Sequence, residues 1–197
     1  KIFNNKIEKN LYKKKFITSD LPNSSNFYAK SKLEAEKALW KISADTGLEV
    51  VILRLPLVYG NGVKGNLLNL IKLIKYSIPL PFNLIKNQRS FLGIDNLIDI
   101  LIHCVDHPKA AGKTFMVSDD EDLSTVDLIK HIAFAMNVKV RLFLFSIFFL
   151  KILSYMIGKH SEIDRLIGSL QVDISNTKKI LNWKPPISVK EGIKRMI

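Results

Sequence analysis

The sequence has a single cysteine, Cys104, and its four histidines do not fall at the spacings of a metal site. An intramolecular disulfide is therefore excluded, and no metal ion is expected. The first residue is Lys1 rather than Met, and no charged start, apolar stretch and small-residue cleavage pattern follows it. Nothing marks a secretory signal, so we expect a cytoplasmic protein and an internal piece of a longer chain.

Arginine is also scarce. The 197 residues carry a net charge of +12, but 25 of the 30 cationic side chains are Lys and only five are Arg. Reading of base edges in nucleic acids depends heavily on bidentate Arg. No zinc-finger, homeodomain or aromatic RNA-binding motif is present. We therefore expect no nucleic-acid partner, and a basic binding module is the least favoured functional alternative.

No apolar run reaches the roughly 20 residues that a membrane-spanning helix needs. The most apolar segment, Leu142 to Gly158, is divided by Lys151 and flanked by Arg141 and Lys159. We expect this segment to form a buried helix. The alternative is a peripheral contact with a membrane or with a polyprenyl-linked sugar.

Helical and extended patterns alternate along the chain. Apolar spacing and capping residues predict helices from Ser25 or Asn26 to Gly47, and over about 66–76, 95–104, 126–136, 175–183 and 188–197. Apolar β-branched runs predict strands at 48–55, 89–94 and 113–118. This alternation predicts an α/β fold with a parallel sheet. The strand at 48–55 reads as buried on both faces, so it needs parallel neighbours that the residues before it do not supply.

Tyr28 and Lys32 form the most informative polar pair. Four-residue spacing at the start of a helix puts both side chains on one face. An ammonium about 4 Å from a phenol favours the phenolate by roughly 4 kcal/mol at an effective dielectric of about 20. Such a Tyr could take a proton from a sugar hydroxyl while hydride leaves the same carbon. On these two residues alone, a surface Tyr beside Lys is the commoner explanation.

Four longer stretches of the sequence are informative: NFYAKSKLEAEKAL, TGLEVVILRLPLVYGNGVKGN, RSFLGIDNLIDI and VDISNTKKILNWKPPISVKEGI. Through them the chain resembles the extended short-chain dehydrogenase/reductases, specifically the NAD-dependent nucleotide-sugar epimerases and dehydratases. The resemblance implies the C-terminal part of a Rossmann-type doubly wound parallel sheet with a smaller α/β substrate-binding domain. Residues 1–60 and 91–106 would complete the dinucleotide-binding domain, and residues 61–90 and 107–197 would build the smaller one.

The resemblance also implies roles for residues near the cofactor. In that family the Tyr of a YxxxK motif is the general acid and base, and the Lys binds the nicotinamide ribose; Tyr28 and Lys32 match these two positions. The backbone at Pro56, Leu57 and Val58 would pass beside the nicotinamide of NAD, with NADP not distinguished. The family's catalytic Ser or Thr and its Gly-rich phosphate-binding turn have no counterpart in these 197 residues.

Three further residues match substrate contacts of the family. Asn66 matches a position at a helix start that contacts the nucleotide diphosphate, and its alternative role is that of an N-cap. Arg89 matches a diphosphate- or sugar-binding Arg, whose planar fork suits two phosphate oxygens. Arg165 is the candidate for a second such Arg, with a surface cation as the alternative for both.

The implied reaction is 4-epimerisation of a UDP-linked sugar through a 4-keto intermediate, for surface-polysaccharide synthesis, by a full-length protein expected to be a homodimer. One departure keeps a second reaction open. Many 4-epimerases carry Tyr-Phe-Asn after the strand Arg, whereas this chain has Leu55-Pro56-Leu57 after Arg54. Branches of the family with a Pro-containing loop include 4-keto-sugar reductases and dehydrogenases, which are the alternative.

Overall fold

The computed structural model describes residues 15–20 and 27–197. The helices are α1 (Phe27–Thr46), α2 (Asn66–Lys75), α3 (Ile94–Asp106), α4 (Thr125–Ala135), α5 (Ile147–Met156), α6 (His160–Ile167), α7 (Ser175–Leu181) and α8 (Val189–Met196). The strands are β1 (Val51–Arg54), β2 (Leu57–Tyr59), β3 (Arg89–Gly93), β4 (Lys113–Met116) and β5 (Asp122–Leu123). The predicted α/β class is confirmed, while the helix caps predicted at Ser25 and Asn26 lie outside the described residues.

Parallel pairing dominates the sheets. β1 pairs in parallel with β4, with Val51 opposite Lys113. β2 pairs in parallel with β3, which pairs on its other side with the short antiparallel strand β5. Among the described residues, β1 has no strand on its other edge. This agrees with the expectation that the strand at 48–55 needs further neighbours.

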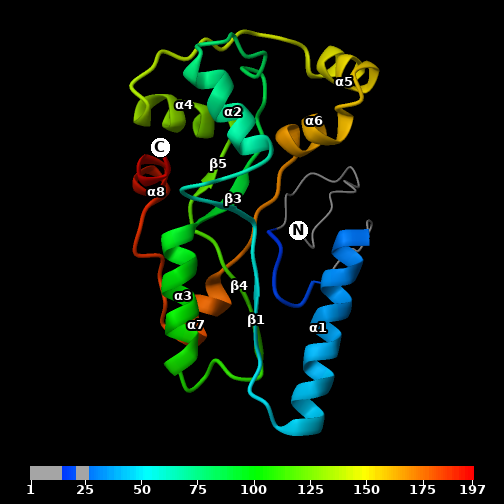
Figure 1. Cartoon of the computed structure of the whole chain (residues 1–197), viewed down its shortest axis with the longest axis vertical. Helices are drawn as coiled ribbons and strands as arrows, with labels where there is room; N and C mark the ends of the chain where they lie inside the picture. The colour runs from blue at the N-terminus through cyan, green and yellow to red at the C-terminus, as the bar shows by residue number, and fades with distance from the viewer. Residues whose placement is uncertain (1–14, 21–26) are drawn as a thin grey trace.

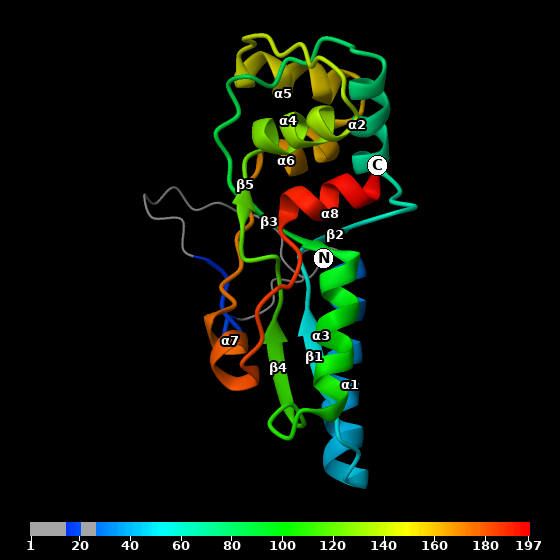
Figure 2. The ribbon, with the colours of Figure 1, turned by 90° about the vertical axis from the view of Figure 1, so that its left-hand side faces the viewer.

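The elements gather at two ends of an elongated molecule. Figures 1 and 2 show α1 and α3 running alongside β1 and β4, with α2, α4, α5 and α6 at the opposite end and α8 between them. The amino-terminal end of α1 points toward the end that carries α6, and its carboxyl-terminal end points away (Figure 1). The first turns of α1, where Tyr28 lies, are therefore near the junction of the two ends.

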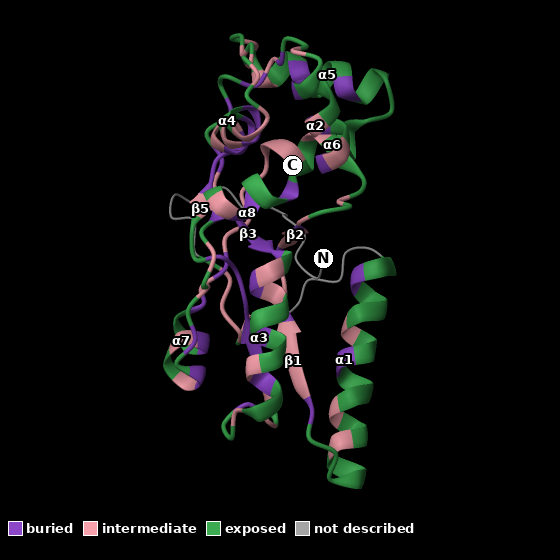
Figure 3. Ribbon diagram, turned by 60° about the vertical axis from the view of Figure 1, so that its left-hand side comes forward, coloured by how far each residue is buried: buried purple, intermediate pink, exposed green. Residues whose placement is uncertain are grey.

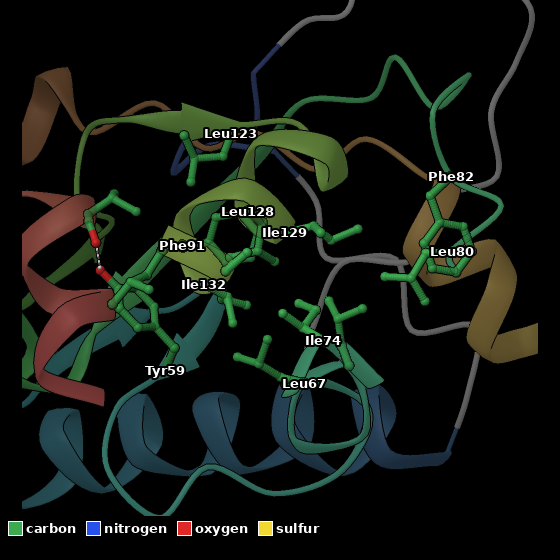
Figure 4. Packing of buried hydrophobic residues seen from close by; sticks show 14 of the residues in the cluster. Tyr59, Leu67, Ile74, Leu80, Phe82, Phe91, Leu123, Leu128, Ile129 and Ile132 are labelled. Atoms are coloured by element: carbon green, nitrogen blue, oxygen red, sulfur yellow. Dashed lines mark hydrogen bonds between the residues drawn. The ribbon is translucent and has the colours of Figure 1, made fainter. Parts of the chain in front are cut away.

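Buried apolar side chains form two clusters. The sheet cluster contains Leu92, Ile100, Cys104, Ala110, Phe115, Met116, Val117, Val172, Ile174, Leu181 and Trp183. The helical cluster draws on β2, β3, α2, α4, α5 and α8. In Figure 4 its members Leu67 and Ile74 of α2 lie near Ile129 and Ile132 of α4. Each end of the molecule therefore has a core of its own.

The sheet cluster includes β4 and α7, although both fall within the range 107–197 assigned from the sequence to the smaller domain. Hydrogen bonding between β4 and β1 explains this packing, since a strand shares the core of the sheet that it joins. The domain boundaries themselves stay a prediction.

The helix predicted over 95–104 is confirmed as α3, but Asp95, at the start of the predicted range, does not cap it. The N-cap is Gly93, and its N–H donates to the carboxylate of Asp119 at 2.9 Å. Asp95 instead forms an ion pair with Arg195 at 3.1 Å. The carboxylate that satisfies the helix start thus comes from the end of another strand, which local spacing does not reveal.

The predicted burial of the apolar segment 142–158 is wrong. Within α5 only Leu150 and Ser154 are buried, and Figure 3 shows most of this helix as exposed. α5 packs chiefly on the short helix α6, which covers a single stripe of its surface. Among the residues that the structure describes, no helix combines the length and the apolar character required to cross a bilayer.

Candidate functional site

Tyr28 and Lys32 lie in the first turns of α1, as the four-residue spacing predicts. The Nζ atom of Lys32 is 5.6 Å from the centroid of the Tyr28 ring, over its face. Tyr28 is 56% exposed, so its phenol is open to a ligand. The structure thus brings these two predicted residues together on one accessible face.

A buried ion pair fixes this face of α1 to the end of β1. Glu36 follows Lys32 by one helical turn and is buried. Arg54 donates from Nη2 to Oε1 of Glu36 at 2.6 Å and from Nε to Oε2 at 3.3 Å. Its Nη1 donates to the Thr18 carbonyl at 2.9 Å. Two parallel bonds between planar groups constrain both distance and orientation, so the pair fixes the position of α1 against β1.

The segment predicted to pass beside the nicotinamide begins two residues after this ion pair. Pro56 is buried, while Leu57 and Val58 are half-buried and start β2, opposite Phe91 and Leu92 of β3. Leu57 contacts the helical cluster and Val58 the sheet cluster, as successive residues of a strand face opposite sides. Arg54 therefore links the Tyr28 helix to segment 56–58 through one intervening residue.

The two predicted substrate-binding arginines also meet. Nη1 of Arg89 donates to the carbonyls of Arg165 and of Gly168, the latter at 3.2 Å. Burial and then the charge of Arg165 lower the pKa of Arg89. Among the described residues, neither guanidinium has a carboxylate partner within ion-pair distance. Two guanidiniums that repel each other and have no carboxylate partner form a site that an anion would stabilise.

The strand that carries Arg89 is held by a different carboxylate. Asp122 accepts hydrogen bonds from Ser90 and Gln171. It also forms an ion pair with Lys15 at 2.8 Å. Burial alone would raise the pKa of Asp122, but these donors outweigh it and the pKa lies below its usual value. Asp122 therefore has its own partners and does not neutralise Arg89.

Asn66 is the first residue of α2 and is exposed. The N-cap of that helix is Gly65, and no side chain caps it, so the alternative role of Asn66 as an N-cap is wrong. Within the described ranges, no hydrogen bond or ion pair joins Asn66 to the arginines or to the Tyr28 pair. The roles of all these residues toward a ligand stay predictions.

A buried carboxylate near the junction, Asp119, was not predicted from the sequence. Asp119 accepts hydrogen bonds from Tyr59 at 2.8 Å, Asn96 at 2.7 Å and the Gly93 N–H. Burial raises the pKa of Asp119, while these three donors oppose the shift. Burial and the charge of Asp119 raise the pKa of Tyr59 far above its usual value, so this phenol stays a donor. The group is structural, and no set of metal-ligating side chains occurs in the described part of the chain.

Comparisons with known proteins add to this geometry. Residues 7–118 match the model of the NAD dependent epimerase/dehydratase family. Over 91% of its length the chain is 44% identical to a UDP-glucose 4-epimerase of Vibrio cholerae, 55% of which is covered. Over 58% of its length it is 26% identical to the N-acetyl-alpha-D-glucosaminyl-diphospho-ditrans,octacis-undecaprenol 4-epimerase of Escherichia coli O157:H7, 35% of which is covered.

A solved structure shows the same fold. The chain superimposes with a TM-score of 0.71 on a UDP-glucuronic acid 4-epimerase from Bacillus cereus in complex with NAD. The two are 20% identical, and the match covers 91% of this chain and 53% of that one. This likeness confirms the predicted Rossmann-type fold. The chain spans about half the length of the V. cholerae and B. cereus relatives.

Proposed function

Because the chain belongs to the NAD dependent epimerase/dehydratase family, we propose that the protein carrying it is a nucleotide-sugar 4-epimerase that acts through a 4-keto intermediate. One observation carries the proposal: Tyr28 and Lys32 share an accessible face of α1. The ion pair between Glu36 and Arg54 supports it, because it holds this face beside the end of β1. The identity to a UDP-glucose 4-epimerase favours a UDP-linked sugar as substrate.

The residues present fit the nicotinamide end of NAD. Lys32 offers an ammonium that can donate to ribose hydroxyls, and its position over the Tyr28 ring keeps that charge near the phenol. When bound, NAD would accept a hydride from the sugar C4 and later return it. In the forward half of the reaction Tyr28 takes the proton of the C4 hydroxyl, and in the reverse half it gives the proton back.

The two arginines support a role in binding the diphosphate of the nucleotide sugar, away from the reacting carbon. Arg89 is anchored to backbone carbonyls of 165 and 168, so its fork is fixed before a ligand arrives. A diphosphate placed between Arg89 and Arg165 would supply the negative charge that this site lacks. Asn66, at the exposed start of α2, is proposed as a further contact to that group.

A one-way 4-keto-sugar reductase is the second candidate, and a specific residue favours it. Leu57 stands where many 4-epimerases have an Asn, and its side chain packs against the helical cluster. It therefore offers no polar contact to a sugar. The two reactions differ in outcome, since an epimerase interconverts two sugars without net consumption of the cofactor.

The test uses the full-length protein with UDP-glucose and UDP-galactose and with their N-acetylated forms. We expect interconversion, with turnover at least ~100-fold lower in Tyr28→Phe and NAD binding largely kept. Lys32→Ala should weaken both turnover and NAD binding. Tyr76→Phe, which changes another exposed Tyr, is the matched control. Wild-type turnover in Tyr28→Phe would refute the assignment, and stoichiometric consumption of reduced cofactor would establish the reductase.

A further inference from the structure

Helix α5 carries more exposed large apolar side chains than α2, α4, α6 or α8. Six large apolar residues of this ten-residue helix are between 45% and 77% exposed. They are Phe148, Phe149, Ile152, Leu153, Tyr155 and Met156. Contiguous exposed apolar surface of this kind marks an interaction site, whereas single exposed apolar residues are ordinary.

The six residues share one side of the helix. At 3.6 residues per turn they occupy an arc of roughly 160°, centred opposite the buried stripe of Leu150 and Ser154. Lys151 lies at the edge of this arc, near Asp164 of α6 at 3.7 Å. α5 is thus fixed to α6 by a narrow stripe, and a broad apolar face points away from the protein. We name this face, with exposed Phe143 and Leu144 before it, the α5 surface.

The chain leading into α5 is held firmly, so the surface is a built feature. Leu80 and residues 141–143 bond to each other in both directions: the Leu80 N–H donates to the Arg141 carbonyl at 2.8 Å, and the Phe143 N–H donates to the Leu80 carbonyl at 3.1 Å. Leu80 itself is buried in the helical cluster. These bonds present Phe143 and α5 in a fixed arrangement.

Basic side chains flank α5 along the chain, while the acidic Glu162 and Asp164 lie on α6. From residue 137 to residue 161 the sequence contains Lys139, Arg141, Lys151 and Lys159 and no Asp or Glu. All four cations are exposed. An apolar face edged by cations is complementary to a partner that has an apolar interior under an anionic outer layer. An anionic lipid bilayer has this chemistry.

We propose that the α5 surface docks on an anionic lipid bilayer, with α5 lying along the headgroup boundary and its cations on lipid phosphates. A helix of ten residues with one side fixed to α6 has the geometry of a surface contact. The proposal does not depend on the catalytic assignment, since none of these residues belongs to the site around Tyr28 or Arg89.

Vesicle co-sedimentation of the full-length protein tests the proposal. We expect binding to vesicles of equal parts phosphatidylglycerol and phosphatidylcholine, and much weaker binding to phosphatidylcholine alone. Phe148→Ser/Phe149→Ser should lower the partition coefficient at least tenfold with unchanged thermal unfolding. The matched control is Val105→Ser/Phe134→Ser, which removes two comparably exposed residues on α3 and α4. It should bind as the wild type does.

The charge contribution is tested separately. Lys159→Glu should weaken binding several-fold at low salt and have less effect at high salt, whereas Lys109→Glu, an exposed cation at the other end of the molecule, should not. Absence of wild-type binding to anionic vesicles overturns the proposal. Equal binding by the Phe148/Phe149 variant and its control also overturns it. A change from dimer to monomer in that variant, without vesicle binding, would assign the surface to a second copy.

Discussion

Two arginines near the junction of the molecule deal with burial in opposite ways. Arg54 is buried with a carboxylate, Glu36, against its guanidinium. Arg89 is half-buried beside a second cation, Arg165, and its bonds go to backbone carbonyls. A compensated charge fixes two elements relative to each other, whereas an uncompensated charge keeps part of its interaction energy for a ligand.

The difference teaches how to separate structural from binding arginines in a chain that has only five. Removing the partner of Arg54 should leave a charge without compensation in the interior. Replacing Arg89 should cost less stability, since it leaves two carbonyls but no charged partner behind, and it should weaken anion binding. Stability and catalysis therefore respond to different variants, and the following experiments test that separation.

The largest effect is expected from Glu36→Ala. The variant leaves Arg54 buried without a carboxylate, which should lower the free energy of unfolding by about 3–5 kcal/mol. Urea unfolding measures the change, with Glu34→Ala as control, because Glu34 is exposed and lies 3.9 Å from Lys30. The double change Glu36→Leu/Arg54→Met should recover most of the loss. Equal midpoints for Glu36→Ala and Glu34→Ala would contradict the structural role.

Arg89→Lys should change catalysis and leave stability nearly unchanged. An ammonium keeps the charge but not the planar fork, so kcat/KM for a UDP-sugar should fall about tenfold, equivalent to about 1.4 kcal/mol. Steady-state kinetics measure it, and Lys86→Ala, three residues away, is the control. If both variants behave as the wild type does, Arg89 is a surface cation and the diphosphate assignment loses its support.

The smallest effect concerns Asp122, which holds the strand of Arg89. Its pKa is lower in the folded protein than in the unfolded chain, so its stabilisation is present above about pH 4 and is lost as pH falls through the folded value. Asp122→Asn should cost about 1 kcal/mol at pH 7 and progressively less below pH of about 4. Unfolding measured across pH checks this, with exposed Asp45→Asn as control. A cost that does not vary with pH would disprove the linkage.

Local patterns predicted the elements whose signals are local. The helix predicted over 126–136 forms as α4, which the capping box of Ser124 and Asp127 opens, and the apolar runs at β1, β3 and β4 form strands. β2, β5 and α6 were missed because they are three, two and eight residues long and depend on contacts with neighbouring elements. The prediction that the α5 segment is buried was wrong. Apolar character indicates a preference for leaving water but does not indicate which surface covers the helix.

The sequence predicted that Tyr28 and Lys32 lie together, but not the ion pair of Glu36 and Arg54 that holds their helix in place. The spacing of Tyr28 and Lys32 gave their common face, and continuing it by four residues reaches Glu36, a signal that was available. Its partner Arg54 lies 18 residues further on, and only the packing of α1 on β1 brings them together. Local spacing contains no such information about contacts between distant elements.

The hydrogen bonds of the Asp119 carboxylate limit which segments of the chain can be exchanged with those of a relative. It accepts hydrogen bonds from Tyr59 of the helical cluster and from Asn96 near the start of α3, a helix whose Ile100 and Cys104 belong to the sheet cluster. Asn96 in turn exchanges two hydrogen bonds with the backbone of Ile187, just before α8.

In α8, a Cβ at Gly192 would lie 2.6 Å from the Tyr59 hydroxyl, so that position accepts no larger residue without displacing the ring. Chimeras that take the helical end from one relative and the sheet end from another would divide these groups between two parents. Such hybrids should fold only when Tyr59, Asn96, Asp119 and Gly192 are inherited together, whereas α5, which contributes none of these groups, should tolerate exchange.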